Sequence, residues 1–94
     1  MYQRVTTPSA KRSLKKLPLK LREEIINATK VLEENSLEGE KLSGSLKFLY
    51  SFHFKYEDVQ YRVAYTIDQK DNLVIIHFAD KRENFYKKLR NLFR

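Results

Sequence analysis

Apolar residues recur at helical spacing in two consecutive segments near the start of the chain. Thr7 and Pro8 are typical of a helix start, and they precede an apolar stripe at i, i+4 and i+7, formed by Ala10, Leu14 and Leu17. Pro18 disfavours helical geometry at the residue before it, so it ends this helix and opens another. The second stripe runs to about Asn35 and comprises Leu21, Ile25, Ala28 and Leu32. The two stripes predict a helical hairpin or a sharp bend.

Most of the remaining chain has the alternating or uniformly apolar pattern of β-strands. The expected strands cover residues 2–6, 46–56, 59–68 and 73–79. Asp80 and Glu83 have capping-box spacing, and the helix that they would start carries an apolar stripe of Phe85, Leu89 and Phe93. The predicted order is β-α-α-β-β-β-α, a single α+β domain over residues 1–94 with a small, mainly antiparallel sheet. We expect the N-terminal helical hairpin to pack on one face of this sheet, and the C-terminal helix to lie on the same side.

The segment YSFHFKYEDVQYRVAY predicts a hairpin whose two faces differ in chemistry. A two-residue turn at residues 57–58 would place His53 directly opposite Arg62, because side chains alternate between faces along each strand. One face of the hairpin would then be apolar and belong to the core: Tyr50, Phe52, Phe54, Tyr61, Val63 and Tyr65. The other face would carry Ser51, His53, Lys55, Gln60, Arg62 and Ala64.

The second face gathers cations and therefore suggests an anion site. Arg62 keeps its proton, so we expect its charge to lower the pKa of His53 and to leave a neutral imidazole at pH 7. A neutral His53, with Lys55 diagonally beside it, can take a proton from a group that an anion brings in. An arginine in the middle of an apolar strand needs an anion or another structural reason. The alternative is that these are ordinary solvated residues on an open sheet face.

The net charge of the chain also suggests an anionic partner, although it does not identify one. The 94 residues are enough for one thin core of two layers. Nineteen Lys and Arg stand against twelve Asp and Glu, a net charge of +7, which suggests a polyanionic partner or a soluble protein that is merely basic. Several of these cations cover the polar side of the first helix: Lys11, Arg12, Lys15 and Lys16.

Several classes of function are not expected from the composition. The chain has no cysteine, which excludes disulfides and thiolate chemistry. Its two histidines are far apart, so we expect no zinc site and no other metal or cofactor. His77 lies among apolar residues of a predicted central strand, which favours a structural role. No apolar run is long enough to span a bilayer and the N-terminus lacks the apolar core of a signal peptide, so we expect a cytoplasmic protein.

Four segments together resemble the RelE/ParE superfamily of bacterial toxins from toxin–antitoxin pairs: AKRSLKKLP before a second helix, EKLSGSLKFLYSFHF, YRVAY, and VIIHFADKRENFY. The order of the predicted elements resembles that fold over nearly the whole chain. The resemblance implies one of two activities. RelE-like members are endoribonucleases that cut mRNA in the ribosomal A site, whereas ParE-like members poison DNA gyrase.

The resemblance also implies which residues would carry a RelE-like activity. In that group activity rests on basic residues of the strand before YRV, on the YRV arginine, on an arginine after the last strand and on a tyrosine near the C-terminus. Arg62 is the YRV arginine here, while Ser51 and His53 stand where the better-studied pattern has lysines. The resemblance therefore predicts a catalytic set of His53, Lys55, Arg62, Arg82 and Tyr86.

Such a set suits RNA cleavage by the ribose 2′-OH without a metal, which needs a base, cations for the phosphorane and an acid for the leaving oxygen. The expected roles are phosphate stabilisation for Arg62 and proton removal for His53 or Lys55. Arg82 would contact a second phosphate or assist the leaving group, and Tyr86 would stack on a base or take part in proton transfer. Residues at the start of an amphipathic helix are also ordinarily exposed and polar, which is the alternative for Arg82 and Tyr86.

The resemblance finally implies partners. One is an acidic, partly disordered antitoxin; for a RelE-like activity the others are mRNA in the ribosomal A site and ribosomal RNA. The candidate RNA-binding residues are Lys11, Arg12, Lys15, Lys16 and Lys81, of which the first four would suit the antitoxin or solvent equally well. Two further interpretations remain: a ParE-like gyrase inhibitor without nuclease activity, and a non-catalytic RNA-binding member of the fold.

Overall fold

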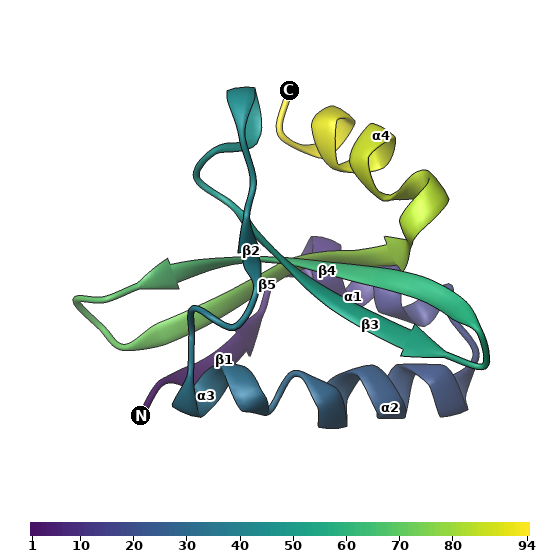
Figure 1. The fold of residues 1–94 in the computed structure, drawn as a ribbon, viewed down its shortest axis with the longest axis horizontal. Coiled ribbons are helices and arrows are strands. Elements are labelled where there is room, and N and C mark those ends of the chain that lie inside the picture. The colour runs from purple at the N-terminus through teal and green to yellow at the C-terminus, as the bar shows by residue number, and fades with distance from the viewer.

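The computed structural model describes residues 1–94, and its centre is a five-stranded sheet with the strand order β1-β5-β4-β3-β2 (Figure 1). β1 runs parallel to β5, and every other neighbouring pair is antiparallel. The strands are Gln3–Thr6 (β1), Glu40–Lys41 (β2), Tyr50–Tyr56 (β3), Val59–Asp68 (β4) and Leu73–Lys81 (β5). The predicted α+β class and the mainly antiparallel sheet are confirmed.

The sheet differs from the prediction between residues 40 and 50. The strand expected at 46–56 begins only at Tyr50, because the chain before it forms a short 3-10 turn (η1, Gly44–Leu46). None of the predicted strands covers β2, but Glu40 pairs with Ser51 and extends the sheet by one strand. A strand of two residues is too short for alternation to reveal it.

Four α-helices cover both faces of the sheet: Pro8–Lys15 (α1), Leu19–Ala28 (α2), Val31–Glu34 (α3) and Arg82–Leu92 (α4). In Figure 1, α2 and α3 lie below the sheet and α4 lies above it. The expectation that all helices lie on one side is therefore wrong. None of the helices has the length and apolar character needed to cross a bilayer.

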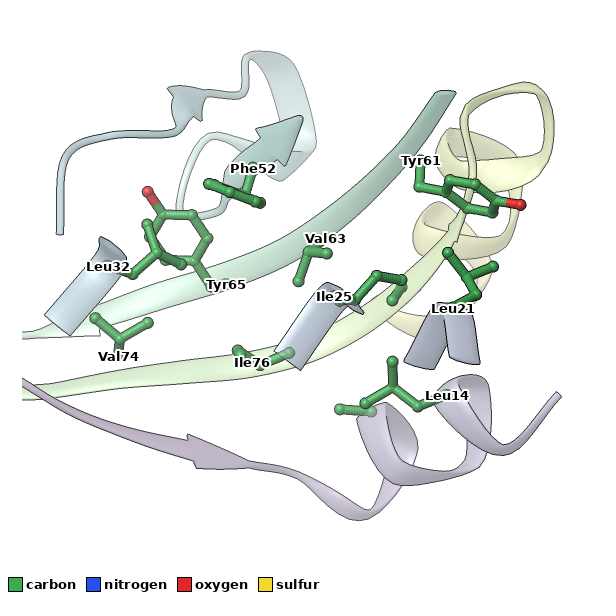
Figure 2. Packing of buried hydrophobic residues seen from close by; sticks show 12 residues of the cluster. Leu14, Leu21, Ile25, Leu32, Phe52, Tyr61, Val63, Tyr65, Val74 and Ile76 are labelled. Atoms are coloured by element: carbon green, nitrogen blue, oxygen red, sulfur yellow. The ribbon is translucent and has the colours of Figure 1, made fainter. Parts of the chain in front are cut away.

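Alternation along β4 explains why the helices divide between the faces. Val63 and Tyr65 belong to a larger core cluster with residues of α1, α2 and α3, most of which Figure 2 shows. Ala64, between them, points the other way and belongs to a smaller cluster with Leu46, Leu49, Phe85 and Leu89. The apolar stripe of α4 packs on this second cluster. Residues 62 and 64 share a face, so α4 lies on the same face of the sheet as Arg62.

The β3–β4 hairpin has the predicted register. His53 is paired with Arg62, and the same register continues through the full length of β3. Glu57 and Asp58 form the two-residue turn with left-handed φ angles of 49° and 65°. Positive φ at both positions is the signature of a type I′ turn, whose twist matches that of the strands. The predicted division of the hairpin into an apolar and a cationic face is confirmed.

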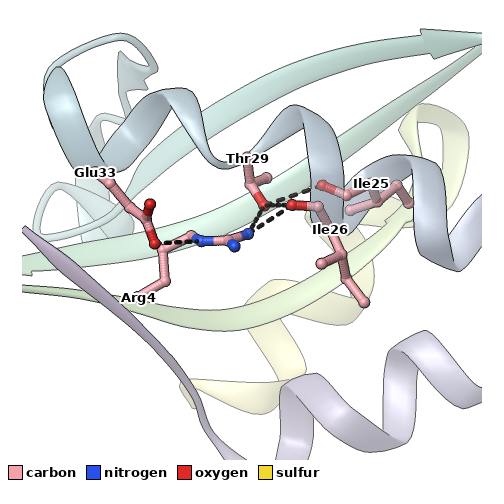
Figure 3. Close-up of polar contacts among 5 residues, drawn as sticks. All are labelled: Arg4, Ile25, Ile26, Thr29 and Glu33. Atoms are coloured by element: carbon pink, nitrogen blue, oxygen red, sulfur yellow. Dashed lines mark hydrogen bonds and ion pairs between the residues drawn. The ribbon is translucent and has the colours of Figure 1, made fainter.

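The second predicted helix is interrupted between α2 and α3 because Arg4 competes for its backbone (Figure 3). Nη1 of Arg4 donates to the Ile26 carbonyl at 2.6 Å and to Oγ1 of Thr29 at 2.9 Å. The N–H of Lys30, which would bond that carbonyl in an unbroken helix, makes a bond to the residue three positions before it instead. Glu33 pairs with Nε of Arg4 at 3.1 Å and so ties α3 to β1.

α1 covers the part of β5 that β1 does not reach. β5 has a bulge at His77, because the residues on either side of it pair with consecutive residues of β4. Oγ of Ser9 donates to the His77 carbonyl at 2.9 Å, and Oγ of Ser13 accepts the Ala79 N–H at 3.1 Å. The two serines are four residues apart, on one face of the helix. They satisfy backbone groups of β5 and fix the end of the strand that carries Asp80.

The loop before β2 is held by Tyr65. Its hydroxyl accepts the Gly39 N–H at 2.9 Å and donates to the Ser36 carbonyl at 2.7 Å. Burial raises the pKa of Tyr65 to about 12, so the hydroxyl keeps its proton under physiological conditions. A Cβ at position 39 would lie 2.6 Å from the Tyr65 hydroxyl oxygen and 2.9 Å from the Ser51 carbonyl oxygen.

Gly39→Ala is therefore expected to destabilise the fold by about 1–3 kcal/mol, the usual cost of inserting a methyl group into a packed region. The Ser51 carbonyl belongs to β3 and cannot move without disturbing the sheet. Urea denaturation measures the change. Leu37→Ala, at an exposed position of the same loop, should change the free energy of unfolding by less than about 0.5 kcal/mol. Equal effects of the two substitutions would contradict the close approach.

Candidate functional site

One row of side chains crosses three neighbouring strands on the α4 face of the sheet. His53 on β3, Arg62 on β4 and Asp80 on β5 stand directly opposite one another in register. Side chains at directly paired positions share a face, with Cβ atoms about 4.5–5.5 Å apart. We call these three residues the cross-strand row. It places a fixed positive charge between an imidazole and a carboxylate.

Arg62, at the centre of the cross-strand row, is buried without a partner. Its exposed fraction is 9%, and neither Nε nor Nη1 has a hydrogen-bond partner in the protein. Burying charged N–H groups without partners is costly, because these two nitrogens have lost water and gained nothing in exchange. Ser51, on the same face two residues before His53, is fully buried and leaves its hydroxyl unpaired as well. An anion at the row would satisfy the guanidinium with charge-assisted hydrogen bonds.

Asp80 does not serve as that anion. Its Oδ1 accepts the backbone N–H of Lys81 at 2.7 Å, and its Oδ2 forms an ion pair with Lys88 of α4 at 3.0 Å. The predicted capping box is wrong, because α4 begins at Arg82 and its N-cap residue, Lys81, makes no side-chain capping bond. Asp80 remains in β5 instead, since pairing with β4 extends that strand to Lys81.

His53 lies at the open side of the row, with 42% of its side chain exposed and Nε2 3.6 Å from the carboxylate of Glu40 on β2. Burial is the largest cause that lowers the pKa of His53, and the charges of Arg62 and Arg82 act in the same direction; Glu40 opposes them. The predicted direction is confirmed, although partial burial outweighs the charge of Arg62. His53 is consequently neutral at pH 7.

Arg82 and Tyr86 line a groove of about 700 Å³ that also contacts Gln60 and Asp58 near the β3–β4 turn. Arg82 is the first residue of α4, where free backbone N–H groups and the helix dipole favour an anion over a cation. Tyr86 is half-buried, with its ring edge-on to that of Phe85 and the centroids 4.9 Å apart. The groove thus combines an unfavourably placed cation with a tyrosine whose ring is held by packing.

Lys55 lies further out on β3, opposite Gln60. Its side chain is 59% exposed, and Nζ is 3.8 Å from the carboxylate of Asp58 in the turn. The fold therefore brings His53 and Arg62 into direct opposition, and it places Lys55 on the same face nearer the turn.

The basic residues of α1 do not lie at this site. α1 packs through Ala10 and Leu14 on the opposite face of the sheet. The candidate RNA-binding residues on that helix and at its end are exposed: Lys11, Arg12, Lys15 and Lys16. Lys81 is the member of the predicted RNA-binding set that lines the groove beside Arg82.

His77 has the surroundings of a structural residue. Its Nε2 is 2.8 Å from Oγ1 of Thr66 on the neighbouring strand, and its ring lies edge-on to Phe93 with the centroids 5.4 Å apart. Burial lowers the pKa of His77, which keeps the ring neutral. These contacts support the structural role expected for this residue.

No curated protein sequence matches this chain, but solved structures do. A chain of the toxin–antitoxin complex RelBE2 from Mycobacterium tuberculosis is 28% identical, with a TM-score of 0.74 over 86% of this chain and 98% of that chain. The isolated RelE toxin of Escherichia coli is 21% identical, with a TM-score of 0.69 over the whole of both chains. A chain of the RelE–RelB complex from Pyrococcus horikoshii is 22% identical, with a TM-score of 0.58 over 86% and 94% of the two chains. The fold is that of RelE toxins.

A sequence model of one family matches residues 5–90 and is described as the ParE-like toxin of the type II bacterial toxin–antitoxin system. The matched range begins within β1 and ends within α4, so it includes the cross-strand row and the groove. The chain belongs to the ParE-like toxins of type II bacterial toxin–antitoxin systems.

Proposed function

We propose that this toxin is an endoribonuclease that cleaves mRNA on the ribosome, the activity implied by its resemblance to RelE-like members. The observation that carries the proposal is Arg62, a buried and unpaired guanidinium in the middle of the cross-strand row. RNA supplies the missing anion as a phosphate. His53, directly opposite and neutral at pH 7, supplies a group that accepts a proton.

The reaction begins when a base removes the proton of a ribose 2′-OH, whose oxygen then attacks the adjacent phosphorus. Arg62 binds non-bridging oxygens of that phosphate and stabilises the added negative charge of the phosphorane. The bond between phosphorus and the 5′ oxygen breaks, and that oxygen takes a proton from an acid. The products are a 2′,3′-cyclic phosphate and a free 5′-OH.

The groove residues complete the site in this proposal. Arg82 contacts a neighbouring phosphate or assists the leaving oxygen, and Tyr86 stacks on a base or takes part in proton transfer. Two residues compete for the role of base. His53 is favoured by its neutral form and its position opposite Arg62, while Lys55 lies on the same strand and face.

The pH dependence of cleavage distinguishes His53 from Lys55. The lowered pKa of His53 predicts a rate that is constant near pH 7 and falls only as the pH drops below about 6.5. If Lys55 is the base, the rate should instead keep rising in alkaline buffer. Single-turnover cleavage of mRNA in a stalled ribosomal complex measures the pH profile. In His53→Gln the fall of the rate at acid pH should disappear. A rate that still climbs in alkaline buffer would favour Lys55.

The same pKa shift affects stability. The folded protein binds a proton at His53 less tightly than the unfolded chain does, so the free energy of unfolding decreases as the pH falls through about 6.5. His77 acts in the same direction. The loss is complete once the pH lies below the lowered values.

We further propose an acidic antitoxin as the protein partner. The similar solved structures include toxin–antitoxin complexes named RelBE2, RelBE and RelE–RelB. A net charge of +7 favours an acidic partner. The proposed substrate, mRNA in the ribosomal A site, puts the activity in the cytoplasm. The exposed cations of α1, on the far face of the sheet, are then available to ribosomal RNA or to the antitoxin.

Primer extension on an mRNA in a translation extract tests the proposed activity. We expect cuts at codon spacing that require ribosomes and leave 5′-OH ends, and we expect Arg62→Ala to remove them. Intact mRNA together with accumulated gyrase–DNA cleavage complexes would refute the ribonuclease and favour gyrase inhibition. Intact mRNA that is bound in a gel-shift assay would favour a non-catalytic RNA-binding protein.

A further inference from the structure

Arg62 and Asp80 are direct neighbours across β4 and β5, yet they form no ion pair. Opposite charges at directly paired positions normally attract each other. Both oxygens of the carboxylate are engaged elsewhere: Oδ1 with the Lys81 N–H at 2.7 Å, and Oδ2 with Nζ of Lys88 at 3.0 Å. The contact with Lys81 joins the Asp80 side chain to the backbone N–H of the next residue in β5. Lys88 is thus the side chain that decides where the second oxygen points.

We propose that Lys88 is a positioning residue: it holds the Asp80 carboxylate away from Arg62 and thereby keeps the guanidinium free for a phosphate of RNA. This inference rests on the proposed function, because it concerns the same site. Without Lys88, Asp80 would pair with Arg62 from within the chain. An RNA phosphate would then have to displace a carboxylate that is already in place.

The location of the ion pair suits this role. The Asp80 side chain is 16% exposed and that of Lys88 is 52% exposed, so the pair lies at the border between the buried Arg62 and solvent. Lys88 belongs to α4, which packs on the same face of the sheet as Arg62. It can therefore neutralise Asp80 while its own side chain stays largely hydrated.

A direct contact between Lys88 and the phosphate makes a different prediction. In that case loss of Lys88 would weaken phosphate binding whatever residue stands at position 80. Asp80→Asn separates the two roles, because asparagine keeps an oxygen for the Lys81 N–H but carries no charge that could pair with Arg62.

The first measurement needs no ligand. The NMR signal of the Arg62 Nε–H reports whether the guanidinium has a partner, and it is assigned by its loss in Arg62→Lys. We expect Lys88→Met to shift this signal and the double variant Lys88→Met/Asp80→Asn to return it to the wild-type position. Lys88→Arg, which retains an ion pair, should leave it unchanged. So should Lys87→Met, which removes an exposed neighbouring lysine. An unshifted signal in Lys88→Met would overturn the proposal.

The second measurement titrates inorganic phosphate and follows the same signal. We expect Lys88→Met to bind phosphate about tenfold more weakly than the wild type, since a charge-assisted bond must be exchanged, and the double variant to regain wild-type affinity. A double variant as weak as Lys88→Met would overturn the proposal in favour of a direct contact. A third outcome is that phosphate leaves the Arg62 Nε–H signal of the wild-type protein unchanged while Lys88→Met still shifts that signal in the absence of ligand. In that case the proposed function fails and the positioning of Asp80 stands.

Discussion

Arg62→Met is expected to stop nearly all of the proposed mRNA cleavage and at the same time to stabilise the fold. The cleavage rate should fall about 10²–10³-fold, because a preorganised group that stabilises charge in the transition state is lost. The free energy of unfolding should rise by about 1–3 kcal/mol, because methionine fills a similar volume without burying an unpaired charge. The pKa of His53 should rise as well, since the charge of Arg62 lowers it.

Single-turnover cleavage, urea denaturation and histidine titration by NMR measure these three effects. Arg90→Met is the matched control, because it removes the same charge at an exposed position of α4. It should leave the cleavage rate unchanged and alter the free energy of unfolding by less than about 0.5 kcal/mol. A clear loss of stability in Arg62→Met would mean that the guanidinium has a partner in the folded protein, and the anion site would lose its main support.

Phe85→Ala is expected to lower the free energy of unfolding by about 3–5 kcal/mol, the usual cost of deleting a fully buried aromatic ring. The ring contacts both Phe78 of β5 and Tyr86 of the same helix. Because α4 is held on the sheet by the smaller core cluster, the substitution should also displace Arg82 and Lys88. Cleavage should therefore be lost together with stability.

Thermal unfolding and cleavage at a temperature where the variant is still folded measure the two effects separately. In a domain of this size 1 kcal/mol corresponds to about 4–8 °C in melting temperature, so the change is large. Leu92→Ala, at an exposed position of the same helix, should shift the melting temperature by only a few degrees. Wild-type cleavage by folded Phe85→Ala would show that α4 contributes nothing to the site.

The β3–β4 half of the cross-strand row was predictable from sequence because its causes are local. Strand alternation fixes which residues share a face, and the turn at Glu57 and Asp58 fixes the register. His53 and Arg62 therefore come together without reference to any other part of the fold.

The other half of the row depends on distant contacts. Asp80 stands opposite Arg62 because the bulge at His77 shifts the register of β5. Ser9 and Ser13 satisfy the backbone there from α1. The periodicity of apolar residues does not reveal this arrangement, and the spacing of Asp80 and Glu83 favours a helix cap instead.

Two further differences between the predicted and the observed fold have separate causes: the break between α2 and α3, and the side of the sheet on which α4 lies. The break between α2 and α3 comes from Arg4, which bonds a hydroxyl 25 residues away, at Thr29. No local pattern predicts that contact. The side on which α4 lies did have a signal, because Ala64 and Phe78 are apolar positions on the same face of the sheet as Arg62. Those two residues are the partners that the stripe of α4 requires.

The parallel pairing of β1 with β5 affects the order in which the candidate site is assembled. Gln3 of β1 is paired with Leu73 of β5, so β1 can join the sheet only after β5 has been synthesised. Contacts between residues this far apart form late in folding. A chain is synthesised from its N-terminus, so Asp80 and α4 are added after the strands that carry His53 and Arg62. The cross-strand row is therefore complete only after β5 and α4 have been synthesised and have packed onto the rest of the domain.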